Sequence, residues 1–177
     1  MRALGLSRVD EAGEYEKLTP GGYVCTITNV EDVRDKEYLR VDFDVSEGKF
    51  KDYYKRLNEV KNFWGGRMVR SYKESALPFF KSMITAIRKS NSYFRWSDDG
   101  QNDEKNLLGM KIGLIFGEEE YIGNDGTKKT RLYVSGMRSV ESIRGNDFIV
   151  PDLKVLKEEK DAPAKKVTPI DDDDLPF

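Results

Sequence analysis

The chain has 177 residues and a net charge of −2, with 38% hydrophobic and 35% charged residues, a composition that fits one domain with a real core plus polar extensions. It contains no histidine and one cysteine, which excludes zinc sites built on those ligands as well as Ser-His-Asp and Cys-His catalysis. No apolar run approaches the roughly 18 residues that span a bilayer, and the first ten residues lack a signal-peptide core, so we expect a cytoplasmic protein.

The first part of the chain predicts three strands. A turn at Pro20-Gly21-Gly22 ends a polar lead-in. Residues 23–30 are rich in β-branched side chains, and residues 38–45 alternate strictly between apolar and polar, so the two segments predict a hairpin. Turn chemistry follows at residues 46–49, and residues 50–57 predict a third strand. We expect residues 58–73 to be irregular.

A helix and two further strands come next. Ser75 can cap a helix that has Pro78 in its first turn and ends near residues 89–91. Its buried stripe would consist of Phe79 or Phe80, Met83, Ile84 and Ile87. After a polar loop at residues 97–106, residues 108–117 and 129–140 predict two strands. Residues 148–156 predict a short last strand or a strap.

Three strands, a helix and two strands are the element order of an OB barrel. We therefore predict a mainly β fold: an OB-like five-stranded β-barrel over residues 1–156, with one helix between strands 3 and 4. Residues 157–170 contain few apolar side chains and predict a flexible linker, and residues 171–177 form an acidic tip. Four basic and seven acidic residues follow residue 156, so the rest of the chain carries a net charge of about +1 and can attract anions locally.

The acidic tip consists of Asp171, Asp172, Asp173, Asp174, Leu175, Pro176 and Phe177. It resembles the tip of bacterial and phage single-stranded DNA-binding proteins, an Asp-rich run followed by a hydrophobic residue, Pro and Phe. The resemblance implies docking to replication, recombination and repair proteins, with the Phe ring in a pocket and the carboxylates against basic residues. An aromatic anchor behind a rigid proline suits that role. The alternative is an incidental solvated tail.

Residues 49–73 combine eight basic residues, two acidic residues and six aromatic rings. Cations neutralise phosphates and rings stack on unpaired bases, so this window predicts a groove for single-stranded DNA. The alternative is that some rings are core residues and the lysines form a solvated face. The candidate DNA-binding residues are Arg40, which precedes this window, and within the window Lys49, Lys51, Tyr53, Tyr54, Lys55, Arg56, Phe63, Trp64, Arg67, Arg70, Tyr72 and Lys73.

A second candidate patch lies around the last two predicted strands, whose connection corresponds to a loop that OB folds use for oligonucleotides. It consists of Tyr121, Lys128, Lys129, Arg131, Tyr133 and Arg138. An ordinary solvated strand face is the alternative.

These signals predict a non-enzymatic protein, without cofactor or metal, that binds and protects single-stranded DNA with little sequence preference. The order of elements in the body is more similar to phage-encoded members of the family, which implies a nucleoid or an infected host cell. We also expect partner proteins at the tip, no membrane association and the possibility of a homo-oligomer. A strand-annealing or recombination-mediator protein is the nearest alternative. An OB-fold module for protein or oligosaccharide, and a nuclease holding metal through Asp42, Asp44 and the Glu47-Gly48-Lys49 step, are more distant ones.

Overall fold

The computed structural model describes residues 1–8 and 16–157. Within these residues the chain is mainly β and forms one antiparallel five-stranded sheet in the order β3-β2-β1-β4-β5. The strands are β1 (Gly21–Val33), β2 (Tyr38–Val45), β3 (Arg67–Ser71), β4 (Lys111–Ile122) and β5 (Lys128–Arg138). The helices are α1 (Tyr53–Lys61), α2 (Leu77–Ser90) and the short α3 (Val140–Arg144). None of these helices is long and apolar enough to cross a membrane.

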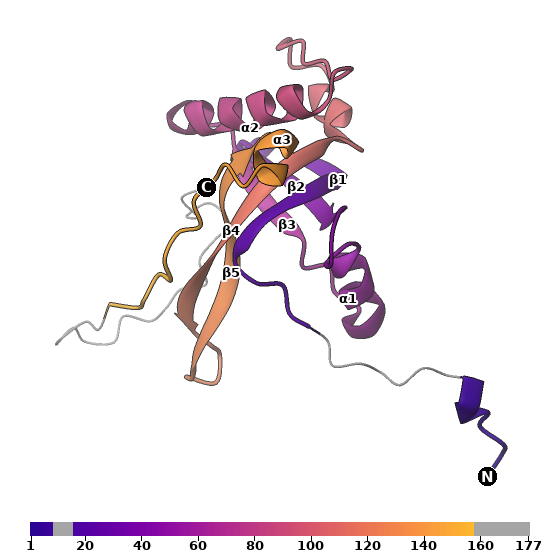
Figure 1. The fold of residues 1–177 in the computed structure, drawn as a ribbon. Helices are drawn as coiled ribbons and strands as arrows, with labels where there is room; N and C mark the ends of the chain where they lie inside the picture. Colours follow the sequence, from indigo (N-terminus) through magenta and orange to yellow (C-terminus); the bar gives the residue numbers. More distant parts are fainter. Residues whose placement is uncertain (9–15, 158–177) are drawn as a thin grey trace.

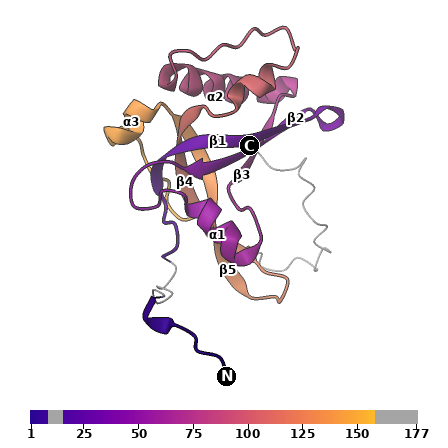
Figure 2. The same cartoon turned by 90° about the vertical axis from the view of Figure 1, so that its right-hand side faces the viewer.

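The core lies between the curved sheet and α2. Val41 and Phe43 of β2 and Leu114 of β4 are almost completely buried, and they join the buried stripe of α2 in one cluster. Helix α2 lies across one end of the sheet, whereas the β4–β5 hairpin extends beyond the opposite end (Figures 1 and 2). The apolar face of α2 thus covers the open end of the strands.

The sheet is open rather than closed into a barrel, because β3 and β5 are its two edges and do not pair with each other. Helix α2 contacts both edge strands, so it stands where the missing pairing would be. The predicted mainly β fold with a helix between the third and fourth strands is confirmed, but the described strands do not form the closed barrel that the element order suggested.

The strand predicted at residues 50–57 is wrong, since most of that segment begins α1. The carboxylate of Asp44, in β2, accepts hydrogen bonds from the backbone N–H groups of Tyr54 at 2.8 Å and Lys55 at 3.0 Å. These N–H groups belong to the first helical turn and would otherwise lack an acceptor. The rings of Tyr53 and Tyr54 are buried below this cap. A side chain of β2 therefore fixes the start of α1.

The third strand instead lies in the segment that we expected to be irregular. Gly66 brings the chain back against β2: the Phe43 N–H donates to the Gly66 carbonyl at 2.8 Å. A Cβ on Gly66 would lie 2.2 Å from the Phe43 carbonyl oxygen, so only glycine allows this approach. Strand β3 then pairs with β2 from Arg67 to Ser71.

Residues 148–156 form a strap, which was one of the two expectations for this segment. The Lys154 N–H donates to the Glu118 carbonyl at 3.0 Å, and the Glu120 N–H donates to the Lys154 carbonyl at 2.9 Å. This single parallel bridge fastens the strap to β4 beyond the end of its pairing with β1.

Removal of the Asp44 carboxylate tests this remote cap. We expect Asp44→Ala to lower the free energy of unfolding by about 1–2 kcal/mol, because two N–H groups of α1 lose their acceptor. Glu59→Ala, on the exposed side of the same helix, is the control and should change stability by less than about 0.5 kcal/mol. Urea denaturation of both variants measures the difference, and equal losses would show that Asp44 does not cap α1.

Candidate nucleic-acid interface

A groove runs between the two unpaired edges of the sheet, and we call it the edge groove. Residues of β3, of β5, of the first turns of α2 and of the connection before β2 line it, and its volume is about 460 Å³. The edge groove therefore occupies the gap that keeps the sheet from closing.

The lining of the edge groove is cationic. Lys36, Arg70, Lys73 and Arg138 contribute to it, and among the described residues no aspartate or glutamate does. A concave surface with charge of one sign focuses the electrostatic potential and attracts oppositely charged groups. The groove thus favours an anionic ligand.

Arg70 is the least exposed of these cations, with 4% of its surface accessible. It stands opposite Leu39 in the β2–β3 ladder, on the inner face of the sheet. One terminal nitrogen donates to the Val69 carbonyl at 3.0 Å, whereas its Nε has no hydrogen-bond partner among the described residues. Burial lowers the pKa of the Arg70 guanidinium to about 10. A buried charge without a carboxylate partner costs stability, and an anion in the groove would offset that cost.

Aromatic side chains stand beside the cations. Phe80 is buried, whereas the adjacent Phe79 is 50% exposed, and both line the groove together with Tyr38. An exposed ring at the edge of a cationic groove can stack on a base.

Two further predicted arginines lie on the other face of β2 and β3 from Arg70. Opposite residues in an antiparallel ladder share a face, and Arg40 pairs with Val69 while Asp42 pairs with Arg67. Arg40 forms an ion pair with Glu31 at 2.7 Å. Arg67 binds Asp42 through two nitrogens at 2.6 and 3.1 Å. Neither of these two predicted arginines lines the edge groove, and each has a carboxylate beside it.

The rest of the basic and aromatic window does not belong to this surface. Lys51, Lys55 and Arg56 are exposed around α1, which lies away from α2 (Figure 1). Lys49 forms an ion pair with Glu16 at 2.5 Å. The window predicted from the sequence is thus divided between two parts of the molecule.

Several predicted stacking rings are structural. Tyr53 and Tyr54 are buried core residues, and the ring of Tyr54 packs edge-on against Phe43. Neither ring has a face open to a base, which corrects the prediction for both. Trp64 is half-buried and its Nε1–H donates to the Gly66 carbonyl at 3.0 Å. Phe63 is 64% exposed and remains available beside α1.

Tyr72 also points away from the edge groove. Its hydroxyl donates to Asp32 at 2.8 Å, and burial, followed by that hydrogen bond, raises the pKa of Tyr72 to about 12. Lys73, the next residue, lines the edge groove.

The cations of the β4–β5 hairpin are paired with acids. Lys128 lies 3.0 Å from Glu120, Lys129 lies 3.4 Å from Asp125, and Arg131 lies 2.8 Å from Glu119. The Arg131 guanidinium also covers the Tyr121 ring at 4.9 Å, and the Lys154 ammonium covers the Tyr133 ring at 4.0 Å. Of the predicted patch, Arg138 alone contributes to the edge groove.

Sequence reasoning missed Lys36, Tyr38 and Phe79 as groove residues. For Phe79 the sequence contained a signal. Helical spacing places Phe80 in the buried stripe of α2, so the adjacent Phe79 must lie outside that stripe. Lys36 and Tyr38 flank Glu37, whose left-handed backbone turns the chain into β2, and nothing in the sequence indicates that this turn meets α2.

The carboxylates that prompted the nuclease alternative have other roles. Asp44 caps α1, Asp42 holds Arg67, and Glu47 forms an ion pair with Arg144. No group of three or more potential metal ligands occurs in residues 1–8 and 16–157.

The acidic tip, Asp171 to Phe177, and the predicted linker at residues 158–170 lie outside the described residues. Comparison with protein-family models gives no match for this chain, and a search of curated proteins finds no relative.

Arg70→Met tests the anion preference of the edge groove. The buried charge costs stability at every pH below about 10, so at neutral pH the substitution should leave the melting temperature unchanged or raise it. Added inorganic phosphate should raise the melting temperature of the unsubstituted protein more than that of Arg70→Met, because a ligand that binds the native state stabilises it.

The matched control is Arg56→Met, which removes an exposed arginine of α1. It should keep the full response to phosphate in the same thermal melts. An undiminished response in Arg70→Met would show that Arg70 does not contribute to anion binding.

Proposed function

We propose that this protein binds single-stranded DNA along the edge groove and the adjoining face of β2 and β3. The observation that carries the proposal is the lining of the groove, where Arg70, Lys73 and Arg138 meet without an acidic residue among the described ones. Cations at the rim neutralise phosphates, and this electrostatic contribution supplies most of the affinity in sequence-tolerant binding.

The half-exposed ring of Phe79 supports an unpaired strand as the ligand. Base stacking on an aromatic side chain requires an accessible base face, which a duplex keeps inside its own stack.

The fold that we propose is an OB-like barrel left open at the edge groove. OB folds are partly open five-stranded barrels that bind oligonucleotides on strands 2 and 3 and on neighbouring loops. The edge groove, lined by residues of β3 and β5, and the neighbouring face of β2 and β3 support this comparison. In this reading the role is stoichiometric coating and protection of DNA during replication, recombination and repair, without catalysis.

Partner recruitment by the acidic tip is a second part of the proposal, and it is supported by the sequence of residues 171–177 alone. Phe177 would supply the aromatic anchor and the four aspartates would meet basic residues on replication or repair proteins.

Binding titrations with oligonucleotides test the main proposal. Affinity should be much higher for a single strand than for a duplex of equal length and should fall as salt rises. Lys73→Ala or Arg138→Ala should each reduce the salt slope by about 1, whereas Phe79→Ala should weaken binding by about 1–3 kcal/mol with little change in slope. Lys61→Ala, on α1, is the control with an unchanged slope.

Two outcomes of these titrations would contradict the assignment. Equal affinity for single strands and duplexes would remove the argument for base stacking. A larger loss in Lys61→Ala than in Lys73→Ala would move the binding surface from the edge groove to α1.

Two full-length variants separate the roles of the tip. Residues 157–170 have the composition of a flexible linker, and a linker of that length spans about 20 Å. Such a linker would let the aspartates compete with DNA for the edge groove. Changing all four aspartates to Asn should then leave DNA affinity unchanged or raise it, most clearly at low salt. Phe177→Ala should leave DNA affinity unchanged and abolish capture of tip-reading proteins. If Phe177→Ala lost DNA binding but still captured partner proteins, the tip rather than the edge groove would be the DNA-binding part.

A further inference from the structure

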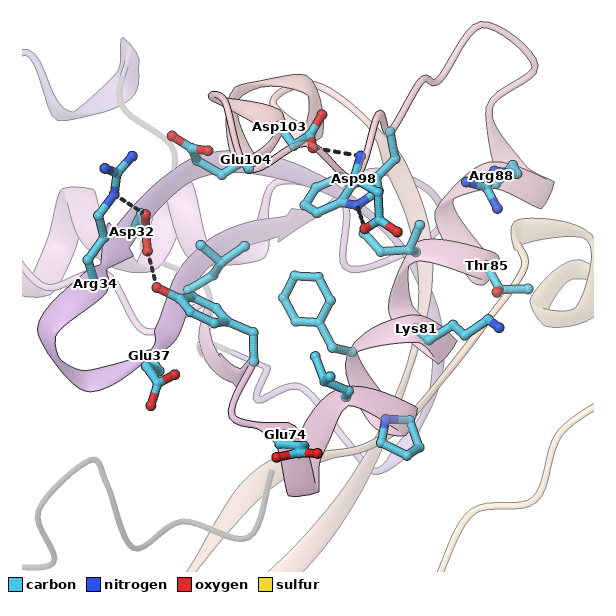
Figure 3. A pocket seen from close by; sticks show the side chains of 18 residues that line it. Asp32, Arg34, Glu37, Glu74, Lys81, Thr85, Arg88, Asp98, Asp103 and Glu104 are labelled. Carbon is cyan, nitrogen blue, oxygen red and sulfur yellow. Dashed lines mark hydrogen bonds and ion pairs between the residues drawn. The ribbon is translucent and has the colours of Figure 1, made fainter.

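A second and larger groove lies along α2, and we call it the acidic groove (Figure 3). Its volume is about 1110 Å³. Residues at the end of β1, before and within α2, and in the loop that precedes β4 line it. It shares only the buried Phe80 with the edge groove, so a ligand in the acidic groove would be separate from DNA.

The charge of the acidic groove is opposite to that of the edge groove. Six carboxylates line it, against three cationic side chains. Such a lining repels a phosphate backbone and attracts cations. Half of the carboxylates already have a neighbour that binds them: Asp32, Asp98 and Asp103 accept hydrogen bonds from Arg34, Trp96 and Ser97 respectively.

The other three carboxylates belong to Glu37, Glu74 and Glu104. Among the described residues, no ion pair or hydrogen bond occupies them. They come from the connection before β2, the turn before α2 and the loop before β4. In Figure 3 they lie on a different side of the opening from Lys81 and Arg88, the two cations of α2. One side of the groove therefore presents negative charge that is open to a ligand.

These three carboxylates do not meet at one point. In residues 1–8 and 16–157 there is no group of three or more acidic, histidine or cysteine side chains that could hold a metal ion. A ligand that uses all three carboxylates must therefore carry positive charges at several places along its length.

The surface between the carboxylates is apolar. The Phe80 ring centre is 5.7 Å from that of Trp96 and 6.3 Å from that of Tyr72. Ile84 is buried, and Leu77 is 46% exposed. Arginine and lysine lay their methylene stems along apolar surface while their charged heads stay in a polar environment, and aromatic rings attract these heads as well. The exposed leucine also accepts an apolar side chain.

We therefore propose that the acidic groove binds a short segment of a partner protein in which basic and apolar residues lie side by side. Its arginine or lysine heads meet the three open carboxylates, and its apolar side chains pack on Leu77 and the surface beside it. The proposal stands on the charge complementarity and the lining of the acidic groove, and it is independent of DNA binding and of the acidic tip.

A synthetic peptide of this chemistry tests the site in full-length protein without DNA. The probe is a fluorescent Gly-Leu-Arg-Leu-Lys-Leu-Arg-Gly peptide with blocked termini, and fluorescence anisotropy measures its binding. Binding should saturate and should weaken as salt rises. The groove variant, Glu74→Gln with Glu104→Gln, should bind the peptide at least about tenfold more weakly. Leu77→Ser, which keeps the charge, should weaken binding by about threefold or more.

Two control variants exclude a general effect of charge. Glu59→Gln with Glu141→Gln removes two exposed carboxylates of α1 and α3 and changes the net charge as much as the groove variant does. It should bind the peptide like the unsubstituted protein. The same result is expected when Asp171 to Asp174 are all changed to Asn, because the tip is not the site. Circular dichroism checks that each variant is folded.

The proposal fails if the unsubstituted protein does not bind the peptide, or if the groove variant binds it as tightly. Binding lost in the tip variant instead would assign the peptide to the tip. A second peptide, Gly-Ser-Arg-Ser-Lys-Ser-Arg-Gly, keeps the charges and lacks the apolar side chains, so it should bind more weakly. Equal affinity for both peptides would show a site for any polycation and would overturn the partner segment as the ligand.

Discussion

The missing pairing between β3 and β5 is the constraint on which the rest of the structure depends. A five-stranded sheet that leaves its edges unpaired must protect them from edge-to-edge association, and α2 stands between these two edges. The gap that remains is the edge groove. There the buried guanidinium of Arg70 lines the groove, and among the described residues its Nε has no hydrogen-bond partner.

Helix α2 lies between two surfaces of opposite charge, and adjacent residues in and before the helix contribute to different surfaces. Phe80 is buried and lines both grooves, whereas Phe79 faces the edge groove only. Lys73 precedes the helix on the cationic side and Glu74 on the acidic side. A short stretch of chain thus borders two surfaces of opposite charge.

The remote cap on α1 explains why the basic window does not act as one surface. Once Asp44 binds the first turn of α1, Tyr53 and Tyr54 turn into the core, and the lysines of the helix turn to solvent. Gly66 then returns the chain to β2, so that Arg67 and Arg70 reach the opposite part of the molecule as residues of β3. Residues 49–73 therefore contribute to two different surfaces, that of α1 and that of the edge groove.

The sequence by itself determined the elements whose pattern is local. The strict alternation of apolar and polar residues predicted β2, and the helical spacing of apolar residues predicted the buried stripe of α2. Both patterns arise within a single element that packs one face against the core. Residues 50–57 were misassigned because their helix depends on a carboxylate in another strand, which no local pattern contains. The tertiary structure decided the site for the same reason: Lys36, Arg70 and Arg138 are far apart in sequence and meet only because the two edges of one sheet curve toward each other around α2.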